Sequence, residues 1–162
     1  MHIQLSNFAI INYNPNDIAH IKFAKDMKEA NKKDNFLYNC IDELIEKSST
    51  TENLHLGYGY MVTDNKRIIG YLRPARKVNI NTLELDLGIH PDYRNKGYGT
   101  KILVEVTDFF LSFEDIKCIK LSIDSSNEYS LKCARKAGYI ETSEKYPRQF
   151  KTYLKRKWAS WK

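Results

Sequence analysis

The sequence predicts an α/β fold of the α+β type, in which one mixed sheet carries helices on both faces. Three observations support this prediction. Apolar residues alternate with polar ones in several short segments, they recur at helical spacing in others, and both kinds of segment follow each other along the chain. Strands joined by a tight turn pair antiparallel, whereas two strands joined through a helix pair parallel. We therefore expect an early antiparallel part and a parallel pair further along the chain.

By this reasoning the first half of the chain contains one strand, two helices and a hairpin. The apolar segment 8–13 predicts the strand, and Asn16 is placed to cap a helix that ends at Ala30. The buried stripe expected for this helix consists of Ile18, Ile21, Phe23, Ala24 and Met27. Asp34 can cap the second helix, whose apolar face would consist of Phe36, Leu37, Cys40, Ile41, Leu44 and Ile45. Strands over 54–62 and 67–74 then flank the turn Asp64-Asn65-Lys66.

The second half alternates strands and helices. LELDLGI, residues 83–89, predicts a strand, and helices are expected at about 99–112 and 127–137, on either side of a strand over 118–124. Two last strands are expected at 139–142 and 150–154. Neither a repeat nor a low-complexity linker interrupts the 162 residues, so we expect residues 1–162 to form a single domain with its own core.

Composition argues against several classes of protein. Charged residues interrupt every apolar run well before the roughly 18 residues that a membrane-spanning helix needs. The first residues, MHIQLSNFAIINYN, lack the basic region and apolar core of a signal peptide, so we expect a cytoplasmic protein without a membrane partner. The three cysteines, Cys40, Cys118 and Cys133, follow no ligand or disulfide spacing, and we expect neither a metal nor a disulfide.

The net charge of +6 belongs to the C-terminal tail. Residues 145–162 contain seven of the 26 lysines and arginines and no acid, whereas the rest of the chain has 19 cations against 20 acids. A basic tail of this kind suits RNA, an acidic protein or an anionic cofactor. It equally fits a solvated strand end that only aids solubility.

The segment RNKGYGTK, residues 94–101, lies where a predicted strand gives way to a helix. The first turn of a helix presents free backbone N–H groups and a partial positive charge, and glycine lets a phosphate approach them closely. Gly97 and Gly99 supply that freedom, and Arg94, Lys96 and Lys101 add positive charge. The segment therefore predicts a pyrophosphate site, although a glycine-containing turn with incidental charges is the alternative. It matches neither a Walker loop nor a dinucleotide fingerprint, because Ile102 stands where the latter needs a third glycine.

Two motifs carry a resemblance to a known family. LGIHPDYRNKGYGTK resembles the acetyl-CoA-binding motif of the GNAT superfamily of N-acetyltransferases, [RQ]-x-x-G-x-[GA], with Arg94, Gly97 and Gly99 at the defined positions. NEYSLKCARKAGY resembles the N-x-x-[SA]-x(7)-G-[FY] segment of the following helix. Its defined positions are filled by Asn127, Ser130, Gly138 and Tyr139. The two motifs and their separation cover residues 83–142.

The resemblance implies a mostly antiparallel central sheet with a splayed parallel strand pair, and acetyl-CoA as a co-substrate without a metal. Between the splayed strands the pantetheine arm would bind like an additional strand. The cofactor-binding residues implied are Leu87, Gly88, Ile89, Arg94, Asn95, Lys96, Gly97, Tyr98, Gly99, Thr100, Asn127 and Ser130.

Acetyl transfer to an amine also needs a base that takes a proton from the ammonium group. Glu84 matches a glutamate of the ribosomal-protein N-terminal and polyamine acetyltransferase branches, and Asp86 is the alternate base. Both could instead be solvated or support the fold. The acid that protonates the leaving thiolate is unassigned, because Ala134 and Ser122 stand where many relatives carry tyrosine or glutamate. Tyr139 is a candidate by residue type, and a packed aromatic is the alternative.

The function predicted is therefore acetyl transfer from acetyl-CoA to a primary amine, such as a peptide N-terminus, a small amine or an amino acid. Residues 16–47 and 146–153 are the variable parts from which acceptor specificity should come. One alternative is a module that binds CoA with little catalysis, and another is an RNA-associated acetyltransferase that uses the basic tail. The oligomeric state is left open, with a homodimer among the options.

Overall fold

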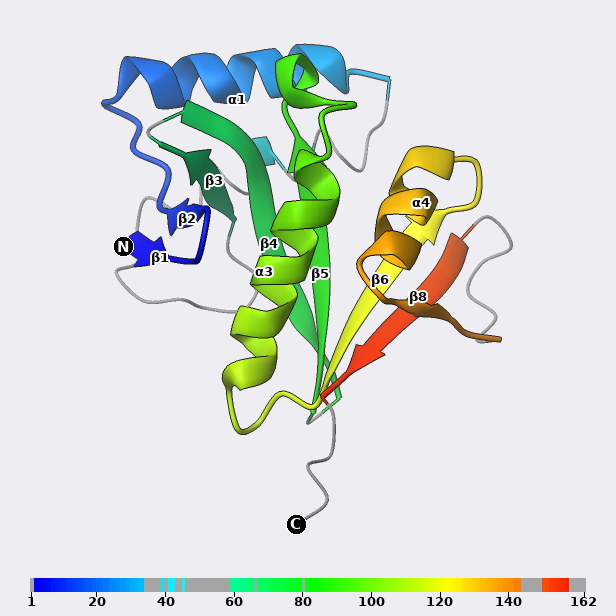
Figure 1. Ribbon diagram of the computed structural model, residues 1–162. Helices are drawn as coiled ribbons and strands as arrows, with labels where there is room; N and C mark the ends of the chain where they lie inside the picture. The colour runs from blue at the N-terminus through cyan, green and yellow to red at the C-terminus, as the bar shows by residue number, and fades with distance from the viewer. Residues whose placement is uncertain are drawn as a thin grey trace. The chain divides into compact units, whose positions relative to one another are not determined.

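The computed structural model describes residues 2–33, 39, 41–42, 45, 59–65, 67–79, 81–143 and 150–157. Its strands are β1 (His2–Gln4), β2 (Ala9–Ile11), β3 (Tyr60–Asp64), β4 (Arg67–Asn79), β5 (Thr82–Ile89), β6 (Cys118–Asp124), β7 (Ile140–Glu141) and β8 (Phe150–Arg156). Its helices are α1 (Ile18–Ala30), the 3₁₀ turn η1 (Pro91–Tyr93), α3 (Tyr98–Ser112) and α4 (Glu128–Lys136). The strands follow in the hydrogen-bonded order β1-β2-β3-β4-β5-β6-β8-β7 (Figure 1). The predicted mixed, mostly antiparallel sheet with a parallel pair is confirmed.

The chain packs into two compact units. The first unit combines residues 1–75 with residues 86–98, and the second combines residues 76–85 with residues 99–162. Strands β4 and β5 each run from one unit into the other. This division lies inside the region that the sequence predicts as one domain, so a single domain over residues 1–162 stays a prediction.

In the first unit, α1 packs on the antiparallel strands β2, β3 and β4. Its N-cap is Asp17, not Asn16 as predicted, because the Asp17 carboxylate accepts hydrogen bonds from the amides of Ala19 (2.8 Å) and His20 (3.4 Å). The core of this unit is a cluster of buried side chains. They are Tyr13, Phe23, Ala24, Met27, Ile41, Met61 and Tyr71. The helix is therefore held mainly by apolar burial against the sheet.

Two residues of the stripe predicted for α1 do not join this core. Ile18 is 83% exposed and Ile21 is 46% exposed, whereas Phe23, Ala24 and Met27 are buried. Successive helical residues are about 100° apart around the axis. Phe23, Ala24 and Met27 therefore share one side, while Ile18 lies nearly opposite it. The prediction was wrong for the two isoleucines, because around the helix axis they do not lie on the side that Phe23, Ala24 and Met27 occupy.

The hairpin predicted in the first unit is confirmed. Several strands begin or end at other residues than predicted. β3 and β4 pair antiparallel, and Asp64 opposite Arg67 closes the hairpin around Asn65, whose φ is +45°. A bulge interrupts this ladder between Val62 and Thr63. β4 continues past Pro74, and the short strand β1, which pairs with β2, was missed. The helix expected after Asp34 and the strand start at 54 lie largely outside the described residues.

In the second unit, β6 is the central strand. It pairs parallel with β5 through Thr82–Glu84 against Cys118–Lys120, and antiparallel with β8 along its whole length. The bounds of β6 are those predicted, whereas β8 runs on to Arg156 and β7 has two residues. The buried side of α3 consists of Gly99, Ile102, Leu103, Val106, Thr107, Phe110 and Leu111. α4 lies beside β6 in Figure 1 and buries Leu131 and Ala134.

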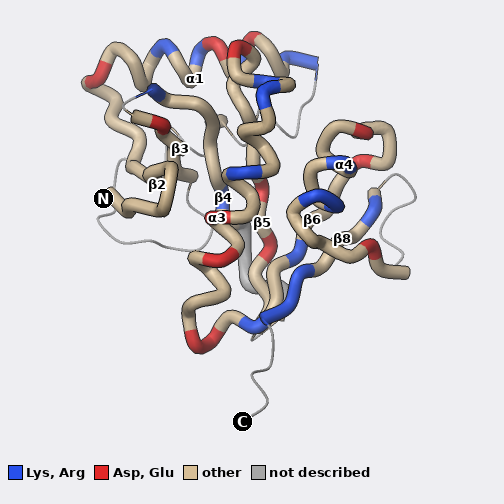
Figure 2. The backbone as a smooth tube through the Cα atoms, viewed as in Figure 1, with Lys and Arg blue, Asp and Glu red and all other residues tan. Residues whose placement is uncertain are grey.

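Positive charge recurs along β8 and α4 in the second unit (Figure 2). Part of it is balanced within the fold. The Lys151 ammonium is 3.0 Å from a Glu141 oxygen, and Lys155 donates to the Ala137 carbonyl at 3.1 Å and lies 3.7 Å from Asp108. The described part of the basic tail thus pairs partly with its own unit. Of the helices that the structure describes, none has the length and apolar composition that a membrane crossing requires.

Candidate active site

The loop between β5 and α3 has the backbone shape that the motif predicts. After η1, Asn95 and Gly97 take positive φ angles of +61° and +80°, and α3 begins at Tyr98. A side chain on Gly97 would meet nothing within 4 Å, so the space beside this glycine is open. Glycine is required there by its conformation, because other residues rarely adopt this φ. The loop residues 94–97 are exposed, and the first turn of α3 follows directly.

The cations of the loop differ in what they contact. Arg94 donates through Nε to the Ile89 carbonyl at 3.0 Å, which ties the loop back to the end of β5. Lys96 donates to the Asp92 carbonyl at 2.7 Å, and its ammonium lies 5.7 Å from the centre of the Tyr93 ring. Both side chains therefore brace the loop while their positive charge remains at its surface. This combination of open backbone, helix N-terminus and cations fits a diphosphate group.

The end of β5 approaches β4 closely at two glycines. A Cβ added to Gly70 would lie 2.5 Å from the Gly88 carbonyl oxygen, and one added to Gly88 would lie 2.1 Å from the Tyr71 ring. The amide of His90 donates to the Ile69 carbonyl at 2.9 Å. The segment Leu87–Ile89, predicted to hold the pantetheine arm, is therefore supported from the β4 side by a packed aromatic ring.

The second motif forms the start of α4. Asn127 is the N-cap of this helix, and its side-chain oxygen accepts a hydrogen bond from the Ser130 amide at 3.0 Å. This bond uses the oxygen of the carboxamide, so its NH₂ group is the part that a cofactor would meet. Both residues belong to the second unit, as do Gly99 and Thr100 in the first turn of α3. The spacing of the motif thus has a local structural cause as well as its predicted role.

Glu84, the predicted base, is 8% exposed and lies on β5 where this strand pairs with β6. Ser122 donates its hydroxyl to Glu84 Oε1 at 2.6 Å. Lys120 is in register with Glu84, is 4% exposed, and shares a side of β6 with Ser122, because residues two apart on a strand point to the same face. The carboxylate therefore sits on a polar strip of the sheet with one oxygen held by a hydroxyl. No local sequence pattern indicates this contact between Ser122 and Glu84, because the two residues are 38 positions apart.

Asp86, the alternate base, is engaged in an ion pair. Its Oδ2 accepts hydrogen bonds from Arg73 Nε at 3.0 Å and from Arg73 Nη2 at 2.6 Å, and both side chains are largely buried. A carboxylate bound by two guanidinium N–H groups is less able to accept a further proton. Asp86 is thus tied to Arg73 by an ion pair, and the identity of the base stays a prediction.

Tyr139, the candidate acid, points away from solvent. Its side chain is 4% exposed, and its hydroxyl is 2.5 Å from the Thr107 hydroxyl of α3. Burial raises the pKa of the Tyr139 phenol well above its ordinary value. A phenol held in this way serves the packing of α3 against the end of α4, and it is a poor donor to a departing thiolate. The acid stays unassigned.

His90, whose place at the end of the strand fits a structural role or a proton relay, lies directly before η1 and the predicted cofactor loop. His90 Nδ1 accepts a hydrogen bond from the Asp92 amide at 3.3 Å, and Nε2 lies 3.4 Å from Asp26 of α1. The Phe23 ring stacks on the imidazole at 5.7 Å. A hydrogen bond from Lys22, with help from His90, lowers the pKa of Asp26. No local sequence pattern predicts the contacts with Asp26 and Phe23, because they join segments more than 60 residues apart.

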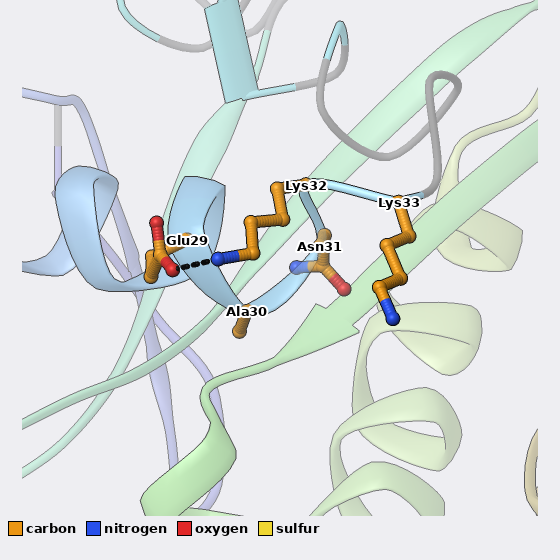
Figure 3. A pocket seen from close by; sticks show the side chains of 5 residues that line it. All are labelled: Glu29, Ala30, Asn31, Lys32 and Lys33. Atoms are coloured by element: carbon orange, nitrogen blue, oxygen red, sulfur yellow. Dashed lines mark hydrogen bonds and ion pairs between the residues drawn. The ribbon is translucent and has the colours of Figure 1, made fainter.

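A hollow of about 280 Å³ lies at the C-terminal end of α1 (Figure 3). It is lined by Glu29, Ala30, Asn31, Lys32 and Lys33. The Lys32 ammonium turns back onto the Glu29 carboxylate at 2.5 Å. None of the predicted site residues lines this hollow. Within the described ranges, no three His, Cys, Asp or Glu side chains gather as a metal site would require.

The mixed sheet with one parallel pair, and the glycine loop that opens α3 after β5, are the features that the resemblance to GNAT acetyltransferases implies. The model of the acetyltransferase (GNAT) domain matches residues 10–140, and the chain belongs to this family. No curated protein matches the chain by sequence.

Three solved structures illustrate the likeness in fold. RimL, a ribosomal L7/L12 α-N-protein acetyltransferase in complex with coenzyme A, has a TM-score of 0.73 and 12% identity, covering 96% of this chain and 98% of its own. A GNAT acetyltransferase from Bacillus anthracis has a TM-score of 0.66 and 15% identity, covering 95% and 96%. The N-acetyltransferase PseH from Campylobacter jejuni, with acetyl-CoA bound, has a TM-score of 0.63 and 14% identity, covering 92% and 98%.

Proposed function

We propose that this protein transfers the acetyl group of acetyl-CoA to a primary amine, with Glu84 as the general base. The observation that carries the proposal is the buried Glu84 carboxylate, which Ser122 holds by one oxygen at 2.6 Å. Membership of the GNAT family and the open glycine loop at the start of α3 support acetyl-CoA as the acetyl donor. The proposal also covers the acceptor, that is, which class of primary amine receives the acetyl group.

The backbone amides of residues 94–100 bind the diphosphate in this proposal, and Leu87–Ile89 bind the pantetheine arm. Asn127 and Ser130 contact the cofactor as their motif implies. The open space at Gly97 and the cations Arg94 and Lys96 fit an anionic group. Acetyl-CoA supplies the acetyl group as a thioester, whose C–S bond breaks as the new C–N bond forms.

Glu84 then removes the proton that makes the acceptor an ammonium ion. An amine of pKa about 10.4 is protonated at neutral pH, and only its neutral form can attack a carbonyl carbon. The Ser122 hydroxyl donates to Oε1 and orients the carboxylate that takes up this proton. Lys120, which is also buried, is in register with Glu84 on the neighbouring strand. The proton moves directly or through one water.

The acceptor that fits best is a peptide N-terminus, a small amine or an amino acid. The β8 strand carries Lys151, Lys155, Arg156 and the adjoining Lys157, so a polycationic acceptor would meet like charge there. The RimL neighbour acts on a protein N-terminus by its description, which supports a peptide acceptor as the first to test. An RNA-associated acetyltransferase remains the alternative based on the basic tail.

A second candidate function is a CoA-binding module without efficient catalysis. Ala134, which stands where many relatives carry the acid, is fully buried, and Tyr139 is bonded to Thr107. The alanine side chain has no proton to give, and burial raises the pKa of the Tyr139 phenol. Turnover of acetyl-CoA separates the two candidates, because only the first produces free thiol in the presence of an amine.

The test is acetyl-CoA-dependent thiol release with pooled peptide N-termini, small amines, amino acids and aminoacylated RNA. We expect turnover with one pool and, for Glu84→Gln, a kcat that falls about 100-fold or more while CoA affinity is unchanged. Glu141→Gln is the matched control, since Glu141 likewise accepts a hydrogen bond from a hydroxyl group, that of Tyr153 at 2.9 Å, but lies on β7. If Glu84→Gln had the kcat of the wild-type protein, the assignment of Glu84 as the base would be wrong. Binding of CoA without turnover in any pool would favour the second candidate.

A further inference from the structure

The cofactor loop is attached to the β3–β4 hairpin by a side-chain hydrogen bond. Tyr98, the first residue of α3, donates its hydroxyl to Asp64 Oδ2 at 3.0 Å, although the two residues are 34 positions apart. The same carboxylate oxygen accepts a hydrogen bond from Arg67 Nη2 at 2.8 Å. Asp64 is largely buried, whereas Arg67 is more than half exposed. The three residues form a connected group, which we call the Asp64 latch.

The position of the Asp64 carboxylate is fixed by the sheet. Asp64 ends β3 and is in register with Arg67, the first residue of β4. Asn65, between them, takes a φ of +45°, as tight hairpin turns require. The acceptor of the latch is therefore held by backbone pairing on one side and by the guanidinium on the other. It does not depend on the conformation of a free loop.

The position of the Tyr98 ring is fixed by two other rings. Phe8 lies edge-on to it with centroids 6.2 Å apart, and Tyr93 lies edge-on at 5.9 Å. Phe8 is buried beside β2. Such edge-to-face contacts orient a ring as well as bury it. The Tyr98 hydroxyl consequently has one direction, and Asp64 lies in that direction. The hydrogen bond to Asp64 raises the pKa of this phenol, so it remains a donor at neutral pH.

The residues between the two anchors adopt an unfavourable backbone conformation. Asn95 takes a φ of +61°, which residues other than glycine seldom adopt, and Gly97 takes +80°. Such conformations persist only where the surroundings determine them. Arg94 holds the near end of the loop through the Ile89 carbonyl, and Tyr98 holds the far end through Asp64. Without the hydrogen bond between Tyr98 and Asp64, the loop would lose a contact that stabilises these backbone angles.

We propose that Asp64, acting through Tyr98, is a positioning residue that holds the amides of residues 94–98 in the shape that binds the diphosphate. This inference rests on the proposed function, because it concerns the same cofactor loop. Asp64 touches neither the acetyl group nor the acceptor amine in this scheme. Its loss affects affinity for the diphosphate-bearing donor and leaves the chemical step intact.

The experiment compares Tyr98→Phe, Asp64→Ala and the double variant, with CoA binding by calorimetry and steady-state kinetics as readouts. Tyr98→Phe keeps the ring contacts and removes only the hydroxyl. We expect each single variant to raise the Kd of CoA and the KM of acetyl-CoA about tenfold, with kcat within about twofold. The double variant should be no worse than either single one, because both remove the same bond. Asp64→Asn keeps an acceptor oxygen and should retain most of the affinity.

A truncated donor separates positioning from a general structural effect. S-Acetyl-pantetheine lacks the diphosphate, so its kcat/KM should be unchanged in Tyr98→Phe. Tyr153→Phe is the matched control, since Tyr153 donates to Glu141 at 2.9 Å in the second unit, and it should leave CoA affinity unchanged. The role of the Asp64 latch would be overturned if Tyr98→Phe left the Kd of CoA unchanged. It would also be overturned if Tyr98→Phe lowered kcat/KM equally for acetyl-CoA and S-acetyl-pantetheine. Either result would leave the proposed function standing. Failure of the wild-type protein to bind CoA overturns the cofactor assignment and the latch together.

Discussion

Replacing Gly88 by alanine tests the close packing of the predicted pantetheine strand. The new Cβ would lie 2.1 Å from Cε1 of Tyr71 and 2.8 Å from Cδ1 and Cζ. Carbon atoms pack at about 3.5 Å or more, so the ring or the strand has to move by roughly 1.4 Å. Tyr71 is fully buried in the core of the first unit, and its ring has little space to move. Overpacking of this kind costs about 1–3 kcal/mol.

For a chain of 162 residues, we expect this cost to lower Tm by about 2–12 °C, measured by differential scanning calorimetry. The KM for acetyl-CoA should rise as well, because Leu87–Ile89 are shifted. Gly97→Ala is the comparison, since its Cβ meets no atom and only its φ of +80° is unfavourable. Removing the ring by Tyr71→Val should make the Gly88→Ala penalty smaller than it is in the wild-type background. An unchanged Tm in Gly88→Ala, or an undiminished penalty in the Tyr71→Val background, would refute the packing argument.

Two further predictions use the buried phenol and the salt bridge of α1. Tyr139→Phe leaves the Thr107 hydroxyl without its partner and should cost about 1–3 kcal/mol of stability with kcat unchanged; a large loss of kcat at unchanged Tm would instead assign Tyr139 as the acid. Lys22, hydrogen-bonded to Asp26, lowers the pKa of that carboxyl in the folded state. This stabilisation is present above the unfolded pKa of Asp26 and disappears as pH falls through the folded one. The stability deficit of Lys22→Ala in urea should therefore be larger at pH 7 than at pH 3, and an equal deficit at both would contradict this reasoning.

The sequence predicted elements well where a single periodic signal dominates. The alternation in LELDLGI and CIKLSID predicted β5 and β6, and the glycine motif placed the start of α3 within one residue. Both signals depend on neighbours along the chain. β1 was missed because three residues are too few to establish a period, and it exists only by pairing with β2. The cap of α1 was misplaced by one residue because Asn16 and Asp17 are both good capping residues.

The sequence was enough to propose which residues belong to the candidate site, but not which side chains they contact. Glu84 and Asp86 share one strand face and look alike in sequence, yet Ser122 binds the first and Arg73 binds the second. These contacts follow from the strand order, which local patterns do not encode. The Asp64 latch is similar, because nothing in the turn sequence indicates a tyrosine 34 positions later.

The strand order has a consequence for self-association. Its two terminal members, β1 and β7, have three and two residues, so each offers very few unpaired backbone groups to another chain. β8, the inner neighbour of β7, bears Lys155 and Arg156 just past the residues that pair with β7, and like charge discourages a second copy from pairing there. Among the described residues, the sheet therefore resists extension from molecule to molecule. If this acetyltransferase forms a dimer, we expect the contact to be made by side-chain surfaces, and the protein to resist fibrous aggregation at high concentration.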